Sequence, residues 1–244
     1  SARTLMILQN LIRIRSCLPE GDELDVVKYI ASIFEPYGVP VNIVRHGNNR
    51  ASMVLSLRGG ESGVKRALMA HLDTVNPLEP RRWLHAPFAA DFDGEKVYGC
   101  GASSSKGGVA AICAAALSLL EAGRLPSGET RLCFTAGGDD DGMGAKSLLE
   151  GGFLEGISEV IFADPTGLGI ATAQKGAVWM KAEVLGRRVH VLEAEKGVDA
   201  LYWLLEFVRR IKGLLKEARP HSLLGGSTVY LTGVFTSERE ICIL

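Results

Sequence analysis

The sequence lacks the features that mark several large classes of protein. Its 27 basic and 28 acidic side chains nearly cancel to a net charge of −1, so it has neither a basic field for nucleic acid nor an acidic tail. No uninterrupted apolar run is long enough to span a bilayer. Internal repeats and low-complexity tracts are also absent from the sequence. These absences argue against nucleic-acid-binding, membrane-spanning and repeat proteins.

Cysteine is sparse and shows no pairing pattern. The chain has five cysteines, an odd number, and none lies in a CxxC pair: Cys17, Cys100, Cys113, Cys133 and Cys242. Such usage predicts reduced, mostly buried thiols in a cytoplasmic protein. The first 16 residues carry arginines and apolar residues at helical spacing with no cleavage site after them, which predicts a core helix and not a targeting peptide.

What is present is typical of a soluble globular chain. Of the 244 residues, 47% are hydrophobic and 23% charged, which is enough apolar material for a sizeable core. Strand-like and helix-like segments alternate, and this order predicts a layered α/β sheet. The expected helices are near 4–16, 22–37, 110–123 and 145–152, and the expected strands near 41–46, 52–59, 65–73, 129–137 and 159–165.

The pattern changes near residue 175. An alternating strand is expected over 175–186, a long amphipathic helix over 198–218 and another strand over 227–235. We therefore expect an α/β domain over 1–174 and part of a smaller α+β domain over 175–244. The apolar ending ICIL is typical of an interrupted strand, so we expect an unpaired sheet edge there.

The stretch ALMAHLDTV carries the most informative polar residues. It brings His71 and Asp73 to the end of a buried strand, and residues two apart on a strand face the same side. A histidine and an aspartate placed in this way can act as a metal ligand and the carboxylate that fixes its tautomer. Open α/β sheets bind ligands at such strand ends. The simpler alternative is a strand-end histidine capped by a turn aspartate.

Two other strand ends also supply carboxylates. Asp139, Asp140 and Asp141 follow one strand, and Asp164 closes another. Histidine and carboxylate oxygen from three strand ends make a donor set suited to a hard or borderline metal, with zinc as the natural choice. Each group also has a plain explanation, because DDDG is typical of a solvated acidic turn and an Asp-Pro pair starts turns.

The motifs in their order resemble the zinc-dependent aminoacylase and metallo-carboxypeptidase family. They are HLDTV, W-x-H-x-P-F, DGEKVYGCGASSSKGG, FTAGGDDDGMGAKSLLE and DPTGLGIATAQKGAVWMKAEVLGRRVH. The family includes acetylornithine deacetylase, succinyl-diaminopimelate desuccinylase and glutamate carboxypeptidase. The resemblance implies a layered α/β zinc-peptidase-like catalytic domain followed by a ferredoxin-like α+β lid and dimerisation domain. It also implies a pair of zinc ions that activate water to cleave an amide or peptide bond, with a carboxylate as general base.

Position by position, the resemblance assigns roles to residues of this chain. His71 matches the first zinc's histidine, Asp73 its orienting aspartate and Asp164 that zinc's terminal carboxylate. His190 matches a lid-domain histidine that reaches the substrate across a dimer. The implied metal is zinc, with cobalt as an alternative, and the implied substrate is a small anionic N-acyl amino acid or peptide. A homodimer is also implied, and the charge balance and lack of a long apolar run predict neither nucleic-acid nor membrane partners.

The chain departs from the family at positions that carry the chemistry. Ser104 stands where the family has the aspartate that bridges both metals, and a neutral hydroxyl cannot offset the repulsion between two dications. In the ungapped match, Gly138 takes the place of the general base and Asp139 that of the adjacent ligand. A slip by one residue would instead give the pair Asp139 and Asp140, with Asp139 as the base. The ungapped match is simpler, and we favour it.

Three functional hypotheses follow from these observations. The first is a metal-dependent amide-bond hydrolase, a deacylase or metallopeptidase, impaired because the bridging aspartate, the general base and the family's distal zinc histidine are not found. We then expect one metal ion or none. The second is a non-catalytic, dimerising or small-ligand-binding homologue or fragment. The third is a serine–lysine acyl hydrolase, because Ser103 and Lys106 form an S-x-x-K pattern, although S-D-N and K-T-G partners are missing.

Overall fold

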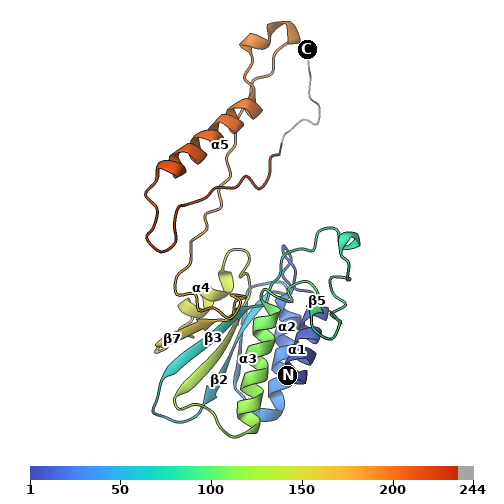
Figure 1. The fold of residues 1–244 in the computed structure, drawn as a ribbon, viewed down its shortest axis with the longest axis vertical. Helices are drawn as coiled ribbons and strands as arrows, with labels where there is room; N and C mark the ends of the chain where they lie inside the picture. The colour runs from blue at the N-terminus through green and yellow to red at the C-terminus, as the bar shows by residue number, and fades with distance from the viewer. Residues whose placement is uncertain (236–244) are drawn as a thin grey trace. The chain divides into compact units, whose positions relative to one another are not determined.

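The chain folds into two compact units, and each is described by itself. The computed structural model describes residues 1–235. The first unit comprises Ser1–Leu168 and contains the sheet, and the second begins at Gly169 (Figure 1). The apolar ending ICIL and Cys242 lie outside the described residues.

A five-stranded mixed sheet forms the centre of the first unit. Its order is β1-β2-β6-β3-β7. The strands are β1 (Val41–Arg45), β2 (Ala51–Arg58), β3 (Lys65–His71), β6 (Glu129–Thr135) and β7 (Glu159–Phe162). Strand β2 pairs antiparallel with β1 and β6, whereas β3 is parallel to both β6 and β7. The short strands β4 (Asp91–Phe92) and β5 (Val97–Tyr98) form a separate antiparallel pair.

Helices cover both faces of the sheet, which confirms the layered α/β prediction (Figure 1). One face packs against α1 (Ala2–Arg13), α2 (Glu23–Phe34) and α3 (Lys106–Glu121), and this layer holds the larger core cluster. The other face carries α4 (Met143–Glu150), whose Leu148 packs in a smaller cluster. Two short 3₁₀ turns complete the unit, η1 (Glu35–Tyr37) and η2 (Pro80–Arg82). Strands β2 and β6 are almost continuously buried because both of their faces are covered.

The parallel pairing brings three carboxyl ends of strands to one edge of the sheet. His71 at the end of β3 lies in register with Thr135 at the end of β6. Beyond the strands, Leu72 N–H donates to the Thr135 carbonyl at 2.8 Å, and Ala163 N–H donates to the Met69 carbonyl at 2.9 Å. Residues that follow β3, β6 and β7 therefore emerge side by side.

The second unit keeps its predicted helix but not its predicted strands. Helix α5 (Ala200–Glu217) begins at an N-cap, Asp199, whose side chain accepts from Tyr202 N–H at 3.0 Å. A 3₁₀ segment, η3 (Val191–Lys196), precedes it. The strands expected over 175–186 and 227–235 are wrong, because these described residues form no strand. Alternating sequence makes a strand only where a neighbouring strand completes the hydrogen-bond ladder, and here pairing is limited to isolated bridges.

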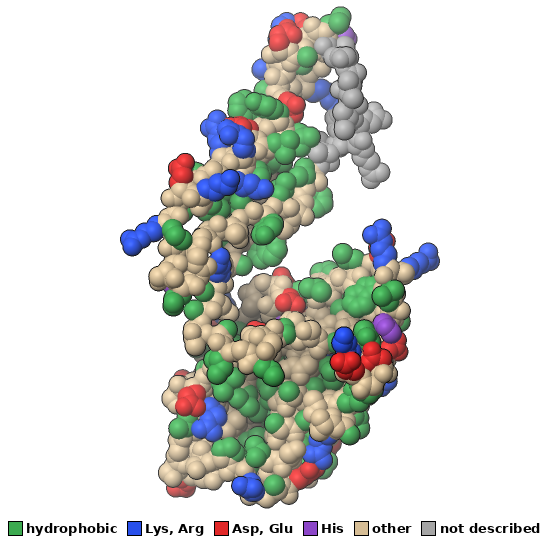
Figure 2. Space-filling view, in the orientation of Figure 1, with side chains coloured by type: hydrophobic (Ala, Val, Ile, Leu, Met, Phe, Trp, Pro, Cys, Tyr) green, Lys and Arg blue, Asp and Glu red, His purple; other side chains and the backbone are tan. Residues whose placement is uncertain are grey.

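Helix α5 exposes a large apolar surface within the described part of its unit. Both hydrophobic and basic side chains are visible on this unit (Figure 2). The exposed aromatic and aliphatic residues of the helix are Leu201, Tyr202, Trp203, Leu205, Phe207 and Leu214. Across the described residues, no helix combines the length and apolarity needed to cross a membrane.

Candidate metal centre

The imidazole of His71 is held in one tautomer at the end of β3. Its Nδ1 donates to the backbone carbonyl of Asp73 at 3.0 Å and lies 3.4 Å from the carboxylate Oδ1 of the same residue. A proton on Nδ1 leaves the lone pair on Nε2, the atom that would bind a metal. The buried hydroxyl of Ser105 fixes the backbone of His71 from the other side, donating to its carbonyl at 2.9 Å and accepting from its N–H at 3.1 Å.

Asp73 is fully buried and connects two strand ends. Its carboxylate accepts from Gly138 N–H at 2.7 Å and from Asp139 N–H at 2.9 Å. These two hydrogen bonds fasten the loop after β6 to the residues that follow β3. The carboxylate of Asp73 thus contacts both the loop after β6 and the imidazole of His71.

The pKa values of this pair move in opposite directions. Burial alone would lower the pKa of His71, but the hydrogen bond and charge of Asp73, with the charge of Asp139, outweigh it and raise that pKa. Burial alone would raise the pKa of Asp73, but the hydrogen bonds from His71 and the two loop amides lower it. The buried carboxylate therefore stays ionised beside the imidazole.

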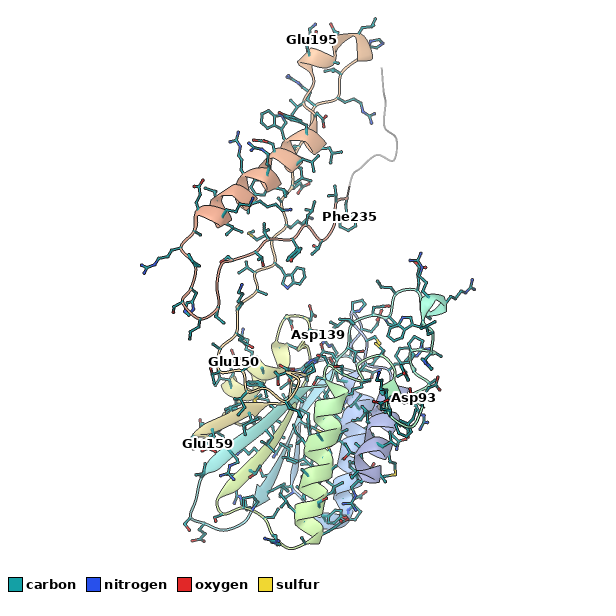
Figure 3. The ribbon with its side chains drawn as sticks, viewed as in Figure 1. Asp93, Asp139, Glu150, Glu159, Glu195 and Phe235 are labelled. Atoms are coloured by element: carbon teal, nitrogen blue, oxygen red, sulfur yellow. The ribbon has the colours of Figure 1, made fainter. Side chains whose placement is uncertain are left out.

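Asp139 completes a cluster with His71 and Asp73. Its Oδ1 lies 3.9 Å from His71 Nε2, and potential ligand atoms of the three residues lie within 4.8 Å of one another. Burial raises the pKa of Asp139, and the negative charges of Asp73 and Asp164 raise it further, against the opposing effect of His71. The cluster lies at the edge of the sheet where the parallel strands end, and Asp139 is labelled there (Figure 3). Asp164, exposed after β7, contributes its charge to the same region.

The donor set fits one divalent metal ion. Zinc binds nitrogen and oxygen ligands at about 2.0–2.2 Å in a tetrahedron, so two of its ligands lie about 3.4 Å apart. The 3.9 Å between His71 Nε2 and Asp139 Oδ1 is longer by about half an ångström, so a small side-chain movement would bring both atoms to a shared ion. A partly exposed carboxylate that lies near two other negative charges is also the kind of group that a cation stabilises. Ser104 Oγ lies 3.5 Å from His71 Nε2, so a neutral hydroxyl borders the imidazole at this position.

Gly138 is packed so tightly that the structure leaves no room for a side chain there. A Cβ atom on Gly138 would lie 2.3 Å from His71 Cβ and 2.5 Å from its Cγ, which is far inside van der Waals contact. A glutamate at this position would therefore require the loop or the imidazole to move. Within this arrangement the ungapped match leaves position 138 without a general base.

The structure separates the three consecutive aspartates. Asp139 faces His71, whereas Asp140 Oδ2 lies 3.6 Å from Arg50 Nη1. Asp141 Oδ1 accepts from Met143 N–H at 2.9 Å in the turn before α4, whose N-cap is Gly142. Asp140 thus lies beside the guanidinium of Arg50, whereas Asp139 lies beside the imidazole of His71.

Arg50 and Glu23 are part of this site that sequence reasoning missed. Glu23 is fully buried and accepts from Arg50 Nη2 at 2.8 Å, with further bonds from Nε at 3.2 and 3.3 Å. Arg50 in turn faces Asp140. The hydrogen bonds that Arg50 donates to Glu23 are the largest cause of its raised pKa, and the charges of Asp73 and Asp140 add to it. The pairing spans two distant elements, so no local motif could have indicated it.

The serine–lysine pattern does not form a catalytic pair. Lys106 is buried, and its ammonium donates to the backbone carbonyl of Ile14 at 2.7 Å, whereas Ser103 is exposed. The lysine is committed to the interior and is unavailable to activate that hydroxyl. This geometry opposes the serine–lysine hypothesis, and a fluorophosphonate probe is accordingly expected to leave Ser103 unlabelled.

Burial of Lys106 predicts a pH-dependent stability. Burial lowers its pKa from 10.5 to about 8, so between these values the unfolded chain binds more protons than the folded chain. Lys106 should therefore contribute a rise in the free energy of unfolding with pH across this window, by about 3 kcal/mol in total, whereas the buried thiols of Cys113 and Cys133, whose pKa values burial raises, contribute a fall above pH 9. Urea unfolding at a series of pH values isolates the lysine contribution as the difference between the parent chain and Lys106→Met, which should lose the rise. An exposed-lysine control, Lys146→Met, should keep it, and equal pH profiles for all three proteins would contradict the assignment.

His190 lies in the second unit and serves there as an N-cap. Its Nδ1 accepts from Leu192 N–H at 3.3 Å at the start of η3. Its predicted contact with a substrate stays a prediction.

Comparisons with known proteins agree with this architecture. Residues 67–229 match the sequence profile of Peptidase family M20/M25/M40. The chain is 31% identical over 217 residues to a probable succinyl-diaminopimelate desuccinylase of Staphylococcus aureus (strain Mu50 / ATCC 700699), covering 89% of this chain and 53% of that protein. A probable succinyl-diaminopimelate desuccinylase of Staphylococcus epidermidis is 28% identical over 219 residues, with 89% and 53% coverage. The chain spans about half the length of the curated relatives it matches.

Solved structures share the fold at low sequence identity. Human carnosine dipeptidase 1 superposes with a TM-score of 0.60 at 17% identity, covering 67% of this chain and 38% of that one. A tripeptidase from Staphylococcus aureus gives 0.57 at 19% identity, covering 86% and 56%. Since the family profile matches well over half of its residues, the chain belongs to Peptidase family M20/M25/M40.

Proposed function

We propose that this chain carries a single-metal site of an amide-bond hydrolase that acts on a small N-acyl amino acid or peptide. The observation that supports it best is the 3.9 Å separation of His71 Nε2 and Asp139 Oδ1, with Asp73 fixing the imidazole. Its S. aureus relative is described as a probable succinyl-diaminopimelate desuccinylase, which supports an acylated amino-acid substrate. The cytoplasmic location stays a prediction from cysteine usage.

In this proposal His71 and Asp139 hold one zinc or cobalt ion, with Asp164 as a third ligand. Such an ion supplies Lewis-acid polarisation of a carbonyl and lowers the pKa of a bound water. Asp73 keeps Nδ1 protonated and ties the loop of Asp139 to β3 through two amide hydrogen bonds. A general base for proton transfer is missing at position 138, because glycine has no side chain that can accept a proton. We therefore propose impaired hydrolysis, with Asp139 as base and Asp140 as ligand only if that loop shifts by one residue.

Metal titration of His71→Ala tests the proposal. We expect the chain to bind at most one zinc ion per molecule, and the variant to bind it at least tenfold more weakly because an imidazole ligand is lost. Elemental analysis and calorimetric titration measure both quantities. Hydrolysis of N-succinyl and N-acetyl amino acids, with and without a chelator, measures activity. Unchanged binding in the variant would place the metal elsewhere.

The control is another histidine–aspartate pair of the same unit. His85 Nδ1 lies 3.0 Å from Asp91 Oδ2 on the exposed surface, away from the cluster of His71. His85→Ala removes a comparable imidazole and should leave metal binding unchanged. Equal losses in both variants would show non-specific binding to surface histidines.

A second candidate function is a non-catalytic homologue that binds a ligand or dimerises. The absence of space at Gly138 and the hydroxyl of Ser104 favour it. The apolar surface of α5 supports homodimerisation, since such a surface is costly to leave in water. Metal binding without any chelator-sensitive hydrolysis would favour this candidate, and a monomeric mass in solution would count against the dimer.

A further inference from the structure

Two thiols from distant segments meet at one hydroxyl group. Cys17 Sγ lies 3.3 Å from Thr74 Oγ1, and Cys100 Sγ lies 3.7 Å from the same atom. The two sulfurs are therefore no more than about 7 Å apart. Cys100 also donates to the Val75 carbonyl at 3.3 Å.

Backbone hydrogen bonds hold both cysteines in place. Cys17 pairs with Thr74 in a parallel bridge, in which Thr74 N–H donates to Ser16 at 2.8 Å and Leu18 N–H donates to Thr74 at 2.9 Å. Cys100 N–H donates to the Pro87 carbonyl at 2.7 Å. The thiols are adjacent because the fold fixes both of their segments.

The two thiols differ in access to solvent. Cys17 is partly exposed, whereas Cys100 is only 2% exposed. Burial raises the pKa of Cys100, and the nearby Lys106 ammonium acts in the opposite direction by favouring the thiolate. The other described cysteines, Cys113 and Cys133, are buried, and burial raises both of their pKa values. An oxidant from solvent therefore reaches Cys17 first and finds Cys100 next to it.

We propose that Cys17 and Cys100 form a redox-active dithiol whose oxidant is a hydroperoxide. The Cys17 thiolate attacks the distal peroxide oxygen, the O–O bond breaks, and the departing oxygen leaves as water or an alcohol once protonated. Cys17 is then a sulfenic acid. The Cys100 thiolate attacks that sulfur, the S–O bond breaks, and hydroxide takes up the Cys100 proton and leaves as water. The thiols lose two electrons in total, and the peroxide gains them.

The site is independent of metal-dependent hydrolysis, so its test needs no enzyme assay. The reduced chain is treated with one equivalent of hydrogen peroxide under native conditions, and remaining thiols are alkylated. Peptide mass spectrometry should then find a Cys17–Cys100 cross-link that disappears on reduction. The Cys100→Ser variant should instead accumulate a sulfenic acid on Cys17 that dimedone traps, because the resolving thiol is gone. Cys17→Ser should leave Cys100 reduced.

A buried thiol elsewhere provides the matched control. Cys133→Ser, on strand β6, should form the Cys17–Cys100 cross-link as the parent chain does. Over-oxidation of Cys17 without a cross-link in the parent chain would overturn the proposal. So would cross-links of Cys17 to other cysteines at equal yield. Circular dichroism of each variant confirms that a lost cross-link does not reflect unfolding.

Discussion

Replacing Arg50 by methionine is expected to lower the free energy of unfolding by about 3–5 kcal/mol. The substitution leaves the fully buried carboxylate of Glu23 without its cation, and an uncompensated buried charge is far more costly than the loss of a surface ion pair. Stability of a typical domain is only about 5–15 kcal/mol, so the loss is a large share of the total. Urea unfolding at neutral pH measures it.

Two further variants separate burial of charge from other causes. Arg58 is 76% exposed and 3.9 Å from its partner Glu129, so Arg58→Met should change stability by less than about 1 kcal/mol. The double variant Glu23→Gln with Arg50→Met removes both charges and should recover part of the loss. If the double variant loses as much stability as Glu23→Gln and Arg50→Met lose separately when added together, this account is contradicted.

The same arginine explains how the acidic loop is arranged. Asp140 faces Arg50, and the residue before it, Asp139, faces His71. Loss of Arg50 therefore also frees Asp140 to compete for a metal. Stability and metal affinity of the Arg50 variant should change together, because one side chain supports both the fold and the loop.

The sheet and the meeting of strand ends could be predicted from the sequence. Apolar runs at 52–59, 65–73 and 129–137 identify buried strands, and polar residues directly after them identify the edge where a site can form. His71 and Asp139 come together because β3 and β6 are parallel neighbours. Strand order itself was not predictable, since it depends on contacts between residues far apart in the chain.

Contacts between residues far apart in the chain could not be predicted from the sequence. The sequence around Arg50 does not indicate that its partner is Glu23. The sequence around Lys106 does not indicate that the Ile14 carbonyl accepts its hydrogen bond. The strands expected at 175–186 and 227–235 failed for the related reason that alternation does not supply a partner strand. Local pattern thus identifies which residues favour an element, whereas pairing decides whether a strand forms.

Replacing Ser104 by aspartate is expected to raise zinc affinity by about 100-fold. Ser104 Oγ is 3.5 Å from His71 Nε2, so a carboxylate at this position would face the proposed ion beside Asp139. A unit charge pair near a protein surface attracts by about 4 kcal/mol at 4 Å, and a net gain of about 3 kcal/mol after desolvation corresponds to two decades. Calorimetric titration with zinc measures the affinity and the number of ions bound.

Ser103→Asp provides the control for added charge alone. Ser103 is the exposed neighbour of Ser104, and the described structure gives it no hydrogen bond to His71, so its carboxylate should change zinc affinity much less. If both variants bind zinc equally well, general electrostatic attraction accounts for the gain. If neither variant improves binding, the loop of Ser104 does not belong to the metal site. A rise confined to Ser104→Asp, with a second zinc ion bound, would mean that one carboxylate separates this chain from a two-metal centre.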